Sequence, residues 1–473
     1  MTRFRVDTHL VAGTMRASTA EPVVMPSPVD LSALTAVRLA DDAMADAAIE
    51  AALAALGPAE ETSRDVRAAA LRALADKLDA RGDELAELAA WEIGCPISQA
   101  RALQVQSASG LLRATADLVQ RHVFEEERIA ARGGRVLVRK TPVGVAVGIV
   151  AWNVPLFLAC EKLGAALAAG CPIILKPSPE NARTMQIFAE LISELDLPKG
   201  MISLLIGGRE LGRQLVSDTR VAKVSFTGST DAGRSVAAVV AQRFARCTLE
   251  LGGKSAAILL DDFQIASRRR ELFLATVQNN GQVCGAQSRV LAPRSAPALV
   301  EGLKSLFDNL KIGDPLDPET DIGPLATAAQ AEKVRRMHAE ALAAGAVPIA
   351  GSIASKEGCY VDAALLRVTP SALLAHEEVF GPIIALIPYG EVEEAIAIAN
   401  DSAFGLSGSV WSPDIARALD IARRLRTGTV GLNSKRILDF AAPFGGHKAS
   451  GIGRELGPEG IDGYLETTAI LLP

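Results

Sequence analysis

One cysteine, Cys284, lies in a stretch of small and amide side chains that would fill no hydrophobic core. The stretch reads Asn279-Asn280-Gly281-Gln282-Val283-Cys284-Gly285-Ala286-Gln287-Ser288-Arg289. A thiolate attacks carbonyl carbon well, but it needs a partly open site, nearby amide donors and a base that processes the product. A lone cysteine is more often an inert, buried, small hydrophobic residue. Cys284 is therefore a candidate nucleophile whose assignment depends on other parts of the chain.

Two further residues could supply what a thiol nucleophile needs. Asn153, in Ala151-Trp152-Asn153-Val154-Pro155, follows a predicted strand, and its NH2 group could donate to a developing oxyanion. Glu250 precedes Gly252 and Gly253, whose lack of side chains would let a ligand approach, and a carboxylate there can act as a general base. The structural alternatives are an ordinary loop residue for Asn153 and a cap before a turn for Glu250.

A glycine-containing loop, Phe226-Thr227-Gly228-Ser229-Thr230-Asp231-Ala232-Gly233, precedes a predicted helix. A helix N-terminus carries free backbone N–H groups and suits a pyrophosphate. The loop does not match G-x-G-x-x-G, so the usual dinucleotide fingerprint is absent. Gly228 and Ser229 are nevertheless candidate phosphate contacts.

The elements that position these residues alternate between short apolar runs and helical stretches from Val143 onward. The expected strands are 143–152, 172–175, 201–206 and 222–226, and the expected helices are 156–169, 180–195, 209–217 and 231–243. This alternation is typical of parallel strands with crossover helices, which bind ligands beyond the carboxyl ends of the strands. Asn153, Lys176 and Gly228 follow or end three such strands, so we expect them on one rim.

The flanking segments predict packing elements. The first thirty or so residues contain Pro22, Pro26 and Pro28, which favour an extended or loose lead-in without a functional role. Helical periodicity follows at about 41–90 and 98–120, and a second α/β unit begins with a strand at 256–260 and continues to about residue 435. A helix of that unit leads directly to the Cys284 loop.

Two strand-like segments lie outside these units. A charged run at 121–128 leads to the strand-like residues 135–140, and the tail 461–473 ends in Ala469-Ile470-Leu471-Leu472. The hairpin is either a solvated surface excursion or an edge offered to another subunit, whereas an exposed apolar terminal strand would be a liability. We expect hairpin and tail to cover each other's edges across subunits.

Length and composition set the limits of function. The chain has 473 residues, a net charge of −6 and 49% hydrophobic residues, which suggests two or three domains and excludes a nucleic-acid footprint or disorder. Its six cysteines have no paired spacing, so we expect neither a disulfide framework nor a metal site, and reduced thiols imply the cytoplasm. Without a signal peptide or a membrane-spanning run, the expected partner is a small molecule, not a membrane.

Seven motifs, taken together, resemble the aldehyde dehydrogenase superfamily from about residue 40 to the C-terminus, with the N-terminal lead-in poorly matched. They are Trp152-Asn153-x-Pro155, Lys176-Pro177-Ser178, Phe226-Thr227-Gly228-Ser229, Glu250-Leu251-Gly252-Gly253-Lys254, Gly281-Gln282-x-Cys284, Glu378-x-Phe380-Gly381-Pro382 and Pro443-Phe444-Gly445-Gly446. A chance match of all seven is not credible. The resemblance is to the hydrolytic, NAD(P)-dependent type.

The resemblance implies an α/β fold with three parts. These are a Rossmann-like, parallel-sheet cofactor domain (1–121 and 143–252), an α/β catalytic domain (253–450) and a β-strand oligomerisation arm (122–142 and 459–473). A homodimer or homotetramer follows from such an arm.

The resemblance also assigns roles to residues. Cys284 attacks the aldehyde, Asn153 and the backbone N–H of Cys284 hold the oxyanion, hydride leaves for the nicotinamide, and Glu250 activates the water that cleaves the thioester. The implied cofactor contacts are Trp152, Lys176, Ser178, Glu180, Gly228, Ser229, Leu251, Glu378 and Phe380. The implied walls of the substrate tunnel are Val154, Leu158, Val283, Ile437 and Leu438.

Departures from the family pattern leave the cofactor and substrate open. Pro179 occupies a position where a carboxylate is common, and the acid is Glu180, so NAD is favoured but NADP is possible. The apolar tunnel walls favour an uncharged aliphatic or aromatic aldehyde, whereas Lys435-Arg436 would suit a semialdehyde with a far carboxylate. Glu250 argues against acyl transfer to coenzyme A. A catalytically silent binding or structural protein is the remote alternative, and the intact Cys284, Glu250 and Asn153 argue against it.

Overall fold

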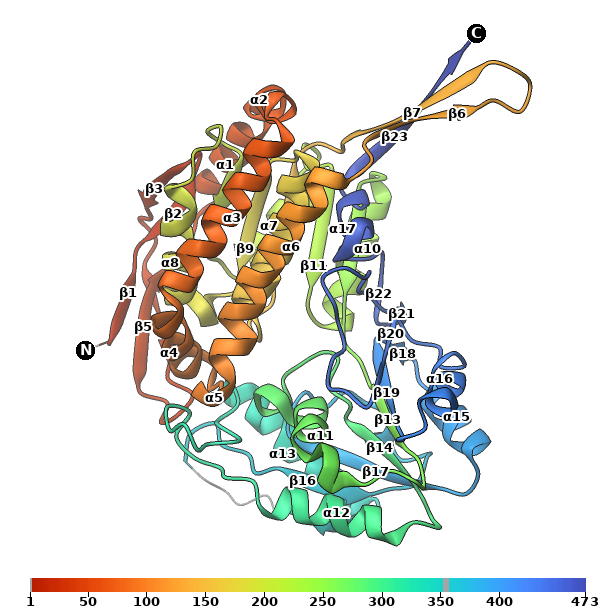
Figure 1. Ribbon diagram of the computed structural model, residues 1–473. Helices are drawn as coiled ribbons and strands as arrows, with labels where there is room; N and C mark the ends of the chain where they lie inside the picture. Colours follow the sequence, from red (N-terminus) through yellow and green to blue (C-terminus); the bar gives the residue numbers. More distant parts are fainter. Residues whose placement is uncertain (1, 352–356) are drawn as a thin grey trace.

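The protein consists of two α/β lobes and a narrow arm that projects from the first lobe (Figure 1). The structure is a computed structural model and describes residues 2–351 and 357–473. The first lobe is built on an eight-stranded sheet with the order β22-β12-β11-β8-β9-β10-β2-β3, and the second on a seven-stranded sheet with the order β15-β16-β17-β14-β13-β19-β20. Among the described residues, no helix is both long and apolar enough to cross a membrane.

Five parallel strands form the centre of the first sheet. They are β8 (Ala146–Val150), β9 (Ile173–Pro177), β10 (Ile202–Leu204), β11 (Lys223–Thr227) and β12 (Arg246–Glu250). The helices between them are α7 (Pro155–Ala169), α8 (Ala182–Ser193), α9 (Arg209–Ser217) and α10 (Thr230–Gln242). The expected alternation is confirmed, and Asn153, Lys176 and Gly228 lie at the carboxyl ends of three adjacent strands as predicted.

The N-terminal residues are extended, as expected, but they are not a loose lead-in. They form β1 (Phe4–Val6), β2 (Thr8–Val11), β3 (Thr14–Ala17), β4 (Pro22–Pro26) and β5 (Ala33–Arg38). Strand β2 pairs antiparallel with β10 and then with β3, so it extends the main sheet. Leu10 and Val11 are fully buried there. Burial of these side chains holds the N-terminal segment in the sheet. The prolines of this segment predicted only an extended or loose chain.

Helices from the N-terminal quarter of the chain pack in the first lobe (Figure 1). They are α1 (Asp42–Ala54), α2 (Leu56–Glu61), α3 (Arg64–Ala80), α4 (Gly82–Ile93), α5 (Ile97–Ala100) and α6 (Ser107–Arg121). A π-helical segment at Arg101–Gln106 joins α5 to α6, so the helix predicted at 98–120 is continuous but locally widened.

The second lobe repeats the α/β pattern. Its strands are β13 (Ala256–Leu259), β14 (Arg289–Pro293), β15 (Val347–Ala350), β16 (Ala364–Arg367), β17 (Ile383–Tyr389), β19 (Ser407–Trp411) and β20 (Thr429–Leu432). Its helices are α11 (Arg269–Val277), α12 (Pro297–Asp308), α13 (Ala328–Ala343), α14 (Leu373–His376), α15 (Val392–Asn400) and α16 (Ile415–Ala422). Strand β15 pairs antiparallel with β16, and the other neighbours in this sheet are parallel.

Short elements return the chain from the second lobe to the first. They are β21 (His447–Lys448), β22 (Gly451–Ile452) and α17 (Gly457–Asp462), and β21 pairs with the earlier short strand β18 (Phe404–Gly405). Strand β22 pairs antiparallel with β12, where Gly451 lies opposite Glu250. The motif at residues 443–446 is thereby placed beside the end of β12.

The arm is a three-stranded sheet made by β6 (Glu125–Ile129), β7 (Arg135–Pro142) and β23 (Leu465–Leu472). Strand β23 pairs antiparallel with β7 from Leu465 opposite Pro142 to Leu472 opposite Arg135. The expectation that the tail and the hairpin cover each other's edges across subunits is therefore wrong, because the tail strand β23 pairs with β7 of its own chain. Among the described residues, the outer edges of β6 and β23 have no strand partner. Ile129 and Leu471 are 94% and 79% exposed.

Candidate active site

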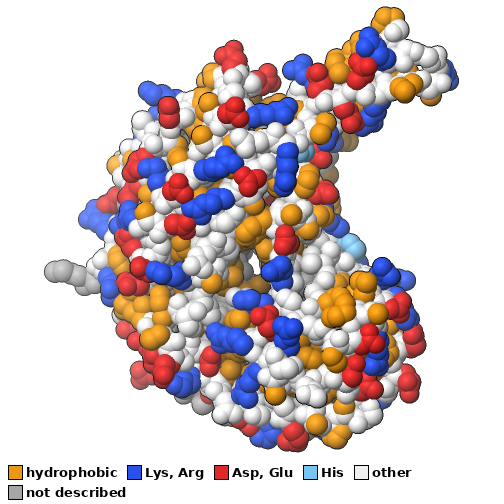
Figure 2. All heavy atoms as spheres, viewed as in Figure 1, with side chains coloured by type: hydrophobic (Ala, Val, Ile, Leu, Met, Phe, Trp, Pro, Cys, Tyr) orange, Lys and Arg blue, Asp and Glu red, His pale blue; other side chains and the backbone are white. Residues whose placement is uncertain are grey.

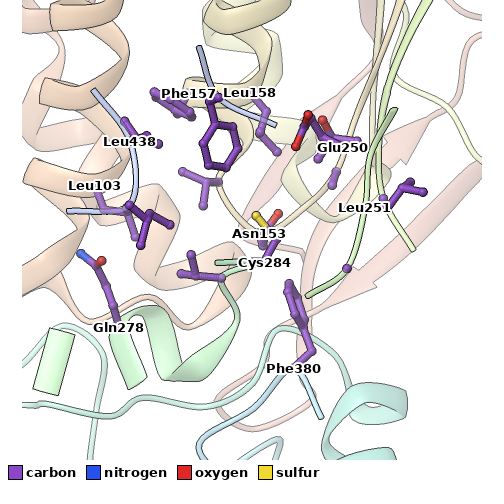
Figure 3. A pocket seen from close by; sticks show the side chains of 18 of the residues that line it. Leu103, Asn153, Phe157, Leu158, Glu250, Leu251, Gln278, Cys284, Phe380 and Leu438 are labelled. Carbon is purple, nitrogen blue, oxygen red and sulfur yellow. The ribbon is translucent and has the colours of Figure 1, made fainter. Parts of the chain in front are cut away.

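A cavity of about 490 Å³ lies between the two lobes, where Figure 2 shows the surface hollowed. Both lobes contribute to its wall, and Figure 3 shows the side chains that point into it. The predicted site residues that line it are Trp152, Asn153, Val154, Leu158, Gly228, Ser229, Glu250, Leu251, Val283, Cys284, Glu378, Phe380, Ile437 and Leu438. The fold thus brings together residues that are almost three hundred positions apart in the sequence.

The Cys284 loop begins with an unusual left-handed turn. The φ angles of Asn279, Asn280 and Gly281 are 52°, 61° and 76°. Asparagine and glycine adopt this region at the lowest cost, which explains the residue types that precede the cysteine. A Cβ atom on Gly281 would lie 2.3 Å from the carbonyl oxygen of Gly381, so this glycine is also required for close approach of another chain segment.

Buried amide side chains tie this turn to both lobes. Asn280 Nδ2 donates to the carbonyl oxygens of Gly94 at 2.8 Å and Pro324 at 2.9 Å. Its Oδ1 accepts from the backbone N–H of Gly323 at 2.7 Å. The Asn280 side chain is fully buried, and these bonds satisfy groups that water does not reach. The position of Cys284 therefore depends on one asparagine that contacts both lobes.

Asn153 is fixed against the same turn. Asn279 Nδ2 donates to the carbonyl oxygen of Asn153 at 3.0 Å, and Asn153 Nδ2 donates to that of Gln282 at 2.9 Å. Asn153 and Cys284 lie side by side in Figure 3. Since an amide nitrogen carries two hydrogens, one remains available to a ligand after the bond to Gln282. The side chain is thus oriented before any ligand binds.

The Cys284 thiol is partly exposed to the cavity. Burial raises its pKa well above the ordinary value, and the neighbouring carboxyls of Glu250, Glu378 and Glu161 raise it further. Cys284 is therefore a thiol at neutral pH in this state of the protein. Attack on an electrophile requires that its proton be removed.

Glu250 is the last residue of β12 and lies opposite Thr227 of β11. Its side chain is 3% exposed, and neither carboxyl oxygen has a hydrogen-bond partner among the described residues. Burial and the charge of Glu455 raise its pKa well above the ordinary value. A Cβ atom on Gly445 would lie 2.8 Å from Oε1, so the glycine of Pro443-Phe444-Gly445-Gly446 makes room for this carboxyl.

The glycines after Glu250 serve the protein's own segments. A Cβ atom on Gly252 would lie 2.4 Å from Glu378 Oε2, and one on Gly253 would lie 2.6 Å from the carbonyl oxygen of Cys284. The backbone N–H of Gly253 donates to Glu378 Oε1 at 2.9 Å. The sequence predicted room for a ligand at this place. The structure uses that room to bring Glu378 and the cysteine loop close to Glu250.

The predicted cofactor residues fall into two groups, one that lines the cavity and one that does not. Ser229 caps α10 by accepting a hydrogen bond from the N–H of Ala232 at 3.3 Å. Phe380 has a φ of 56°, uncommon for a bulky residue, and its ring meets that of Trp152 edge to face at 5.5 Å. Ser229, Trp152 and Phe380 line the cavity beside Gly228 and Leu251.

Lys176, Ser178 and Glu180 do not line this cavity. They lie at and beyond the end of β9, the strand next to β8, on the same rim of the sheet. Burial lowers the pKa of Lys176 to about 8, and the hydroxyl of Ser178 donates to Glu180. A ligand that reached all predicted cofactor residues would have to extend along the rim from α10 to β9.

Several lining residues escaped the sequence prediction. The ones absent from it are Leu103, Ser107, Phe157, Glu161, Glu271, Gln278, Gln330, Lys333 and Ser434, whereas Thr227 and Phe444 belong to quoted motifs but were given no role. Phe157 and Glu161 share a helical face with Val154 and Leu158, so helical spacing could have found them. Leu103 lies in the π-helical segment, whose side-chain directions no regular period predicts.

Comparison with known proteins identifies the family of this chain. Residues 15–470 match the family model described as the aldehyde dehydrogenase family. The chain belongs to the aldehyde dehydrogenase family. The predicted family, α/β fold class and enzyme class are thereby confirmed, and this dehydrogenase is matched further toward the N-terminus than the expected start near residue 40.

Individual relatives of this dehydrogenase share most of its length. It is 41% identical to geranial dehydrogenase of Castellaniella defragrans over 86% of this chain and 85% of the relative. It is 38% identical to a 3-succinoylsemialdehyde-pyridine dehydrogenase of Pseudomonas sp over 92% of each chain. The crystal structure of a Mycobacterium tuberculosis aldehyde dehydrogenase complexed with NAD+ matches with a TM-score of 0.96 and 37% identity, covering 100% of this chain and 99% of that one.

We predict that Asn280→Ala destabilises the enzyme by about 3 kcal/mol, because it leaves two buried carbonyl oxygens and one N–H without a partner. Denaturant unfolding measures the change. The control is Asn309→Ala, which removes a single exposed bond to the carbonyl oxygen of Ser305. It should cost less than about 1 kcal/mol. Equal, small effects of both substitutions would contradict the role given to Asn280.

Proposed function

We propose that Cys284 is the nucleophile of an aldehyde dehydrogenase that produces a carboxylic acid, with Asn153 and Glu250 as its catalytic partners. The observation that carries this proposal is the convergence of the three residues on one cavity, at the ends of two sheet strands and one loop. A thiol, an oriented amide donor and a buried carboxyl are the groups that acyl chemistry on sulfur requires.

The proposed reaction begins when the Cys284 thiol loses its proton to a water molecule and the sulfur adds to the carbonyl carbon. The free hydrogen of Asn153 Nδ2 and the N–H of Cys284 stabilise the oxygen anion of this thiohemiacetal. NAD, when bound, accepts hydride, so that the adduct is oxidised to a thioester. Glu250 then takes a proton from the water that attacks the thioester, and the acid leaves while the thiol is restored.

The raised pKa of Glu250 suits a residue that must both accept and release a proton. A base works best when its pKa is near the operating pH, and burial moves a carboxyl in that direction. Neither oxygen of Glu250 has a hydrogen-bond partner among the described residues, so both can accept a hydrogen bond from a water molecule. Acyl transfer to coenzyme A would have no use for such a base.

NAD is the proposed cofactor, and the related enzyme bound to NAD+ supports it. The N-terminus of α10 with Gly228 and Ser229 would bind the pyrophosphate, Lys176 and Glu378 the riboses, and Phe380 with Trp152 and Leu251 the nicotinamide end. Glu180, bonded to Ser178, would accept hydrogen bonds from the adenosine ribose and disfavour a 2′-phosphate. NADP remains the alternative cofactor.

An uncharged, mainly apolar aldehyde is the proposed substrate. Val154, Leu158, Val283, Ile437 and Leu438 line the cavity, and the ring of Phe157 stacks on Phe440 at 6.4 Å. A carboxylate buried among them would lack a partner. The geranial dehydrogenase relative agrees with this class.

A semialdehyde is the second candidate substrate. Lys435 and Arg436 also line the cavity, and one relative is a semialdehyde dehydrogenase. However, Arg436 is largely exposed and lies 3.5 Å from Asp439, so part of its charge is already compensated. This contact favours the uncharged substrate.

The proposed organisation keeps 1–121 and 143–252 as the cofactor domain, 253–450 as the catalytic domain, and 122–142 with 459–473 as an oligomerisation arm. The free edges of β6 and β23 and the exposed Ile129 and Leu471 support a homodimer or homotetramer. All six cysteines are unpaired, which fits the proposed cytoplasmic location.

We predict that Cys284→Ala abolishes aldehyde oxidation, whereas Glu250→Gln gives a burst of NADH followed by slow turnover. The glutamine variant can still form the thioester but lacks the base for its hydrolysis. Stopped-flow absorbance at saturating aldehyde and NAD distinguishes the two defects. Cys247→Ala, at a partly exposed cysteine outside the cavity, is the control and should retain turnover. Full steady-state turnover in either catalytic variant would refute the mechanism.

We predict that hexanal and benzaldehyde have a higher kcat/KM than succinic semialdehyde, because the inner wall offers no partner to a carboxylate. The three aldehydes are compared at equal concentration with NAD. Arg436→Ala should leave this order unchanged. If the semialdehyde is preferred and Arg436→Ala removes its advantage selectively, the apolar assignment is wrong.

We predict that light scattering gives more than one chain per particle, and that deleting residues 465–473 lowers this mass or precipitates the protein. The deletion removes β23, so the backbone groups of β7 that face β23 lose their partners, while the edge paired with β6 is kept. Deleting Pro473 alone, which lies beyond the strand, is the control. A wild-type enzyme that is a stable, active monomer would contradict the proposed arm.

A further inference from the structure

One wall of the cavity carries a carboxyl group that the proposed mechanism does not use. Val154, Phe157, Leu158 and Glu161 all line the cavity from the start of α7, and their spacing of three and four residues places them on one helical face. The first three are apolar. Glu161 is thus a polar group on a wall that otherwise favours hydrocarbon.

The environment of Glu161 holds it in the neutral form. It is 4% exposed, and its Oε1 has no hydrogen-bond partner among the described residues. Burial raises its pKa well above the ordinary value, and Glu455 raises it further through its charge and a hydrogen bond, as does the charge of Glu250. Lys162 opposes these influences only in part.

Glu455 remains charged beside it. Lys162 Nζ lies 2.9 Å from Glu455 Oε1, and the hydroxyl of Ser225 also donates to this oxygen. Although burial opposes ionisation, Lys162 and the hydrogen bond from Glu161 lower the pKa of Glu455 to about 2. A neutral Glu161 keeps a carbonyl oxygen, and its Oε1 has no hydrogen-bond partner among the described residues. What remains for the cavity is hydrogen-bond acceptor capacity.

An acceptor in an apolar cavity discriminates between substrates. An aldehyde that displaces water from Glu161 without offering a donor leaves a buried polar atom unpaired, which is unfavourable. An aldehyde with a hydroxyl group at that place replaces the lost hydrogen bond. A carboxylate there would have no proton to donate and would face the carboxyls of Glu161 and Glu250.

We propose that Glu161 determines specificity by accepting a hydrogen bond from a hydroxyl group of the aldehyde. The preferred substrates are then uncharged aldehydes with one hydroxyl on an otherwise apolar body. This inference rests on the proposed dehydrogenase function and narrows its substrate class.

The test compares hydroxybenzaldehyde isomers with methoxybenzaldehydes substituted at the same ring position, because the methoxy group retains the oxygen but cannot donate. The quantity measured is the ratio of kcat/KM values, hydroxy over methoxy, with NAD as cofactor. For at least one ring position this ratio should be about tenfold or more in the wild type. Glu161→Met should lower it to about one.

Two further variants separate hydrogen bonding from shape. Glu161→Gln retains a carbonyl oxygen for the substrate and an NH2 group for Glu455, so it should keep most of the ratio. Glu271→Gln changes another carboxyl that lines the cavity, one that accepts from the N–H of Lys435 at 3.1 Å, and should leave the ratio unchanged. The same pair of aldehydes is used with every variant. A change in the kcat/KM ratio between variants therefore does not arise from the difference in bulk between the hydroxy and methoxy groups alone.

The inference is overturned if the wild-type ratio is near one at every ring position, or if Glu161→Met keeps the wild-type ratio. The wild-type measurement alone already decides the first point, so the test does not depend on the folding of Glu161→Met. Oxidation of benzaldehyde by the wild type establishes the dehydrogenase function separately. If no aldehyde is oxidised, the proposed function itself fails.

Discussion

The active site depends on a buried left-handed turn, Asn279–Gly281, that holds Cys284 between two lobes. Asn280 bonds to backbone groups of Gly94, Gly323 and Pro324, and Asn279 bonds to the backbone of Asn153. Because these amides are buried, each bond replaces one to water and none can be lost cheaply. These bonds therefore link the Cys284 turn, Asn153 and both lobes, and preorganisation of this kind is what the proposed acyl chemistry requires.

Burial also controls the charges around the thiol. It raises the pKa of Cys284, Glu250 and Glu161, so that all three hold protons more firmly than in water. Only Glu455, paired with Lys162, stays strongly acidic. Burial thus favours the neutral forms of Cys284, Glu250 and Glu161, which suits an uncharged aldehyde beside them. The raised pKa of Glu250 suits the proposed exchange of a proton with water.

Much of this arrangement could be predicted from the sequence, because it is local. Apolar runs from Val143 onward gave the parallel strands, and the motifs placed Cys284, Glu250 and Asn153 on a common site. What the sequence could not give depends on distant partners. The N-terminal strands are fixed by pairing of β2 with β10, Gly252 is required by Glu378, and Leu103 reaches the cavity from a π-helical segment. Burial raises the pKa of Glu161, and Glu455, from the far end of the chain, raises it further.

The central claim is that Cys284 carries the acyl group during turnover. Acid quenching of the Glu250→Gln variant shortly after mixing with benzaldehyde and NAD, followed by peptide mass spectrometry, tests it most directly. The account predicts a benzoyl adduct on the peptide that contains Cys284, and none on the peptides of Cys95, Cys160, Cys171, Cys247 or Cys359. An adduct on another residue, or NADH formation without any covalent adduct, would contradict it.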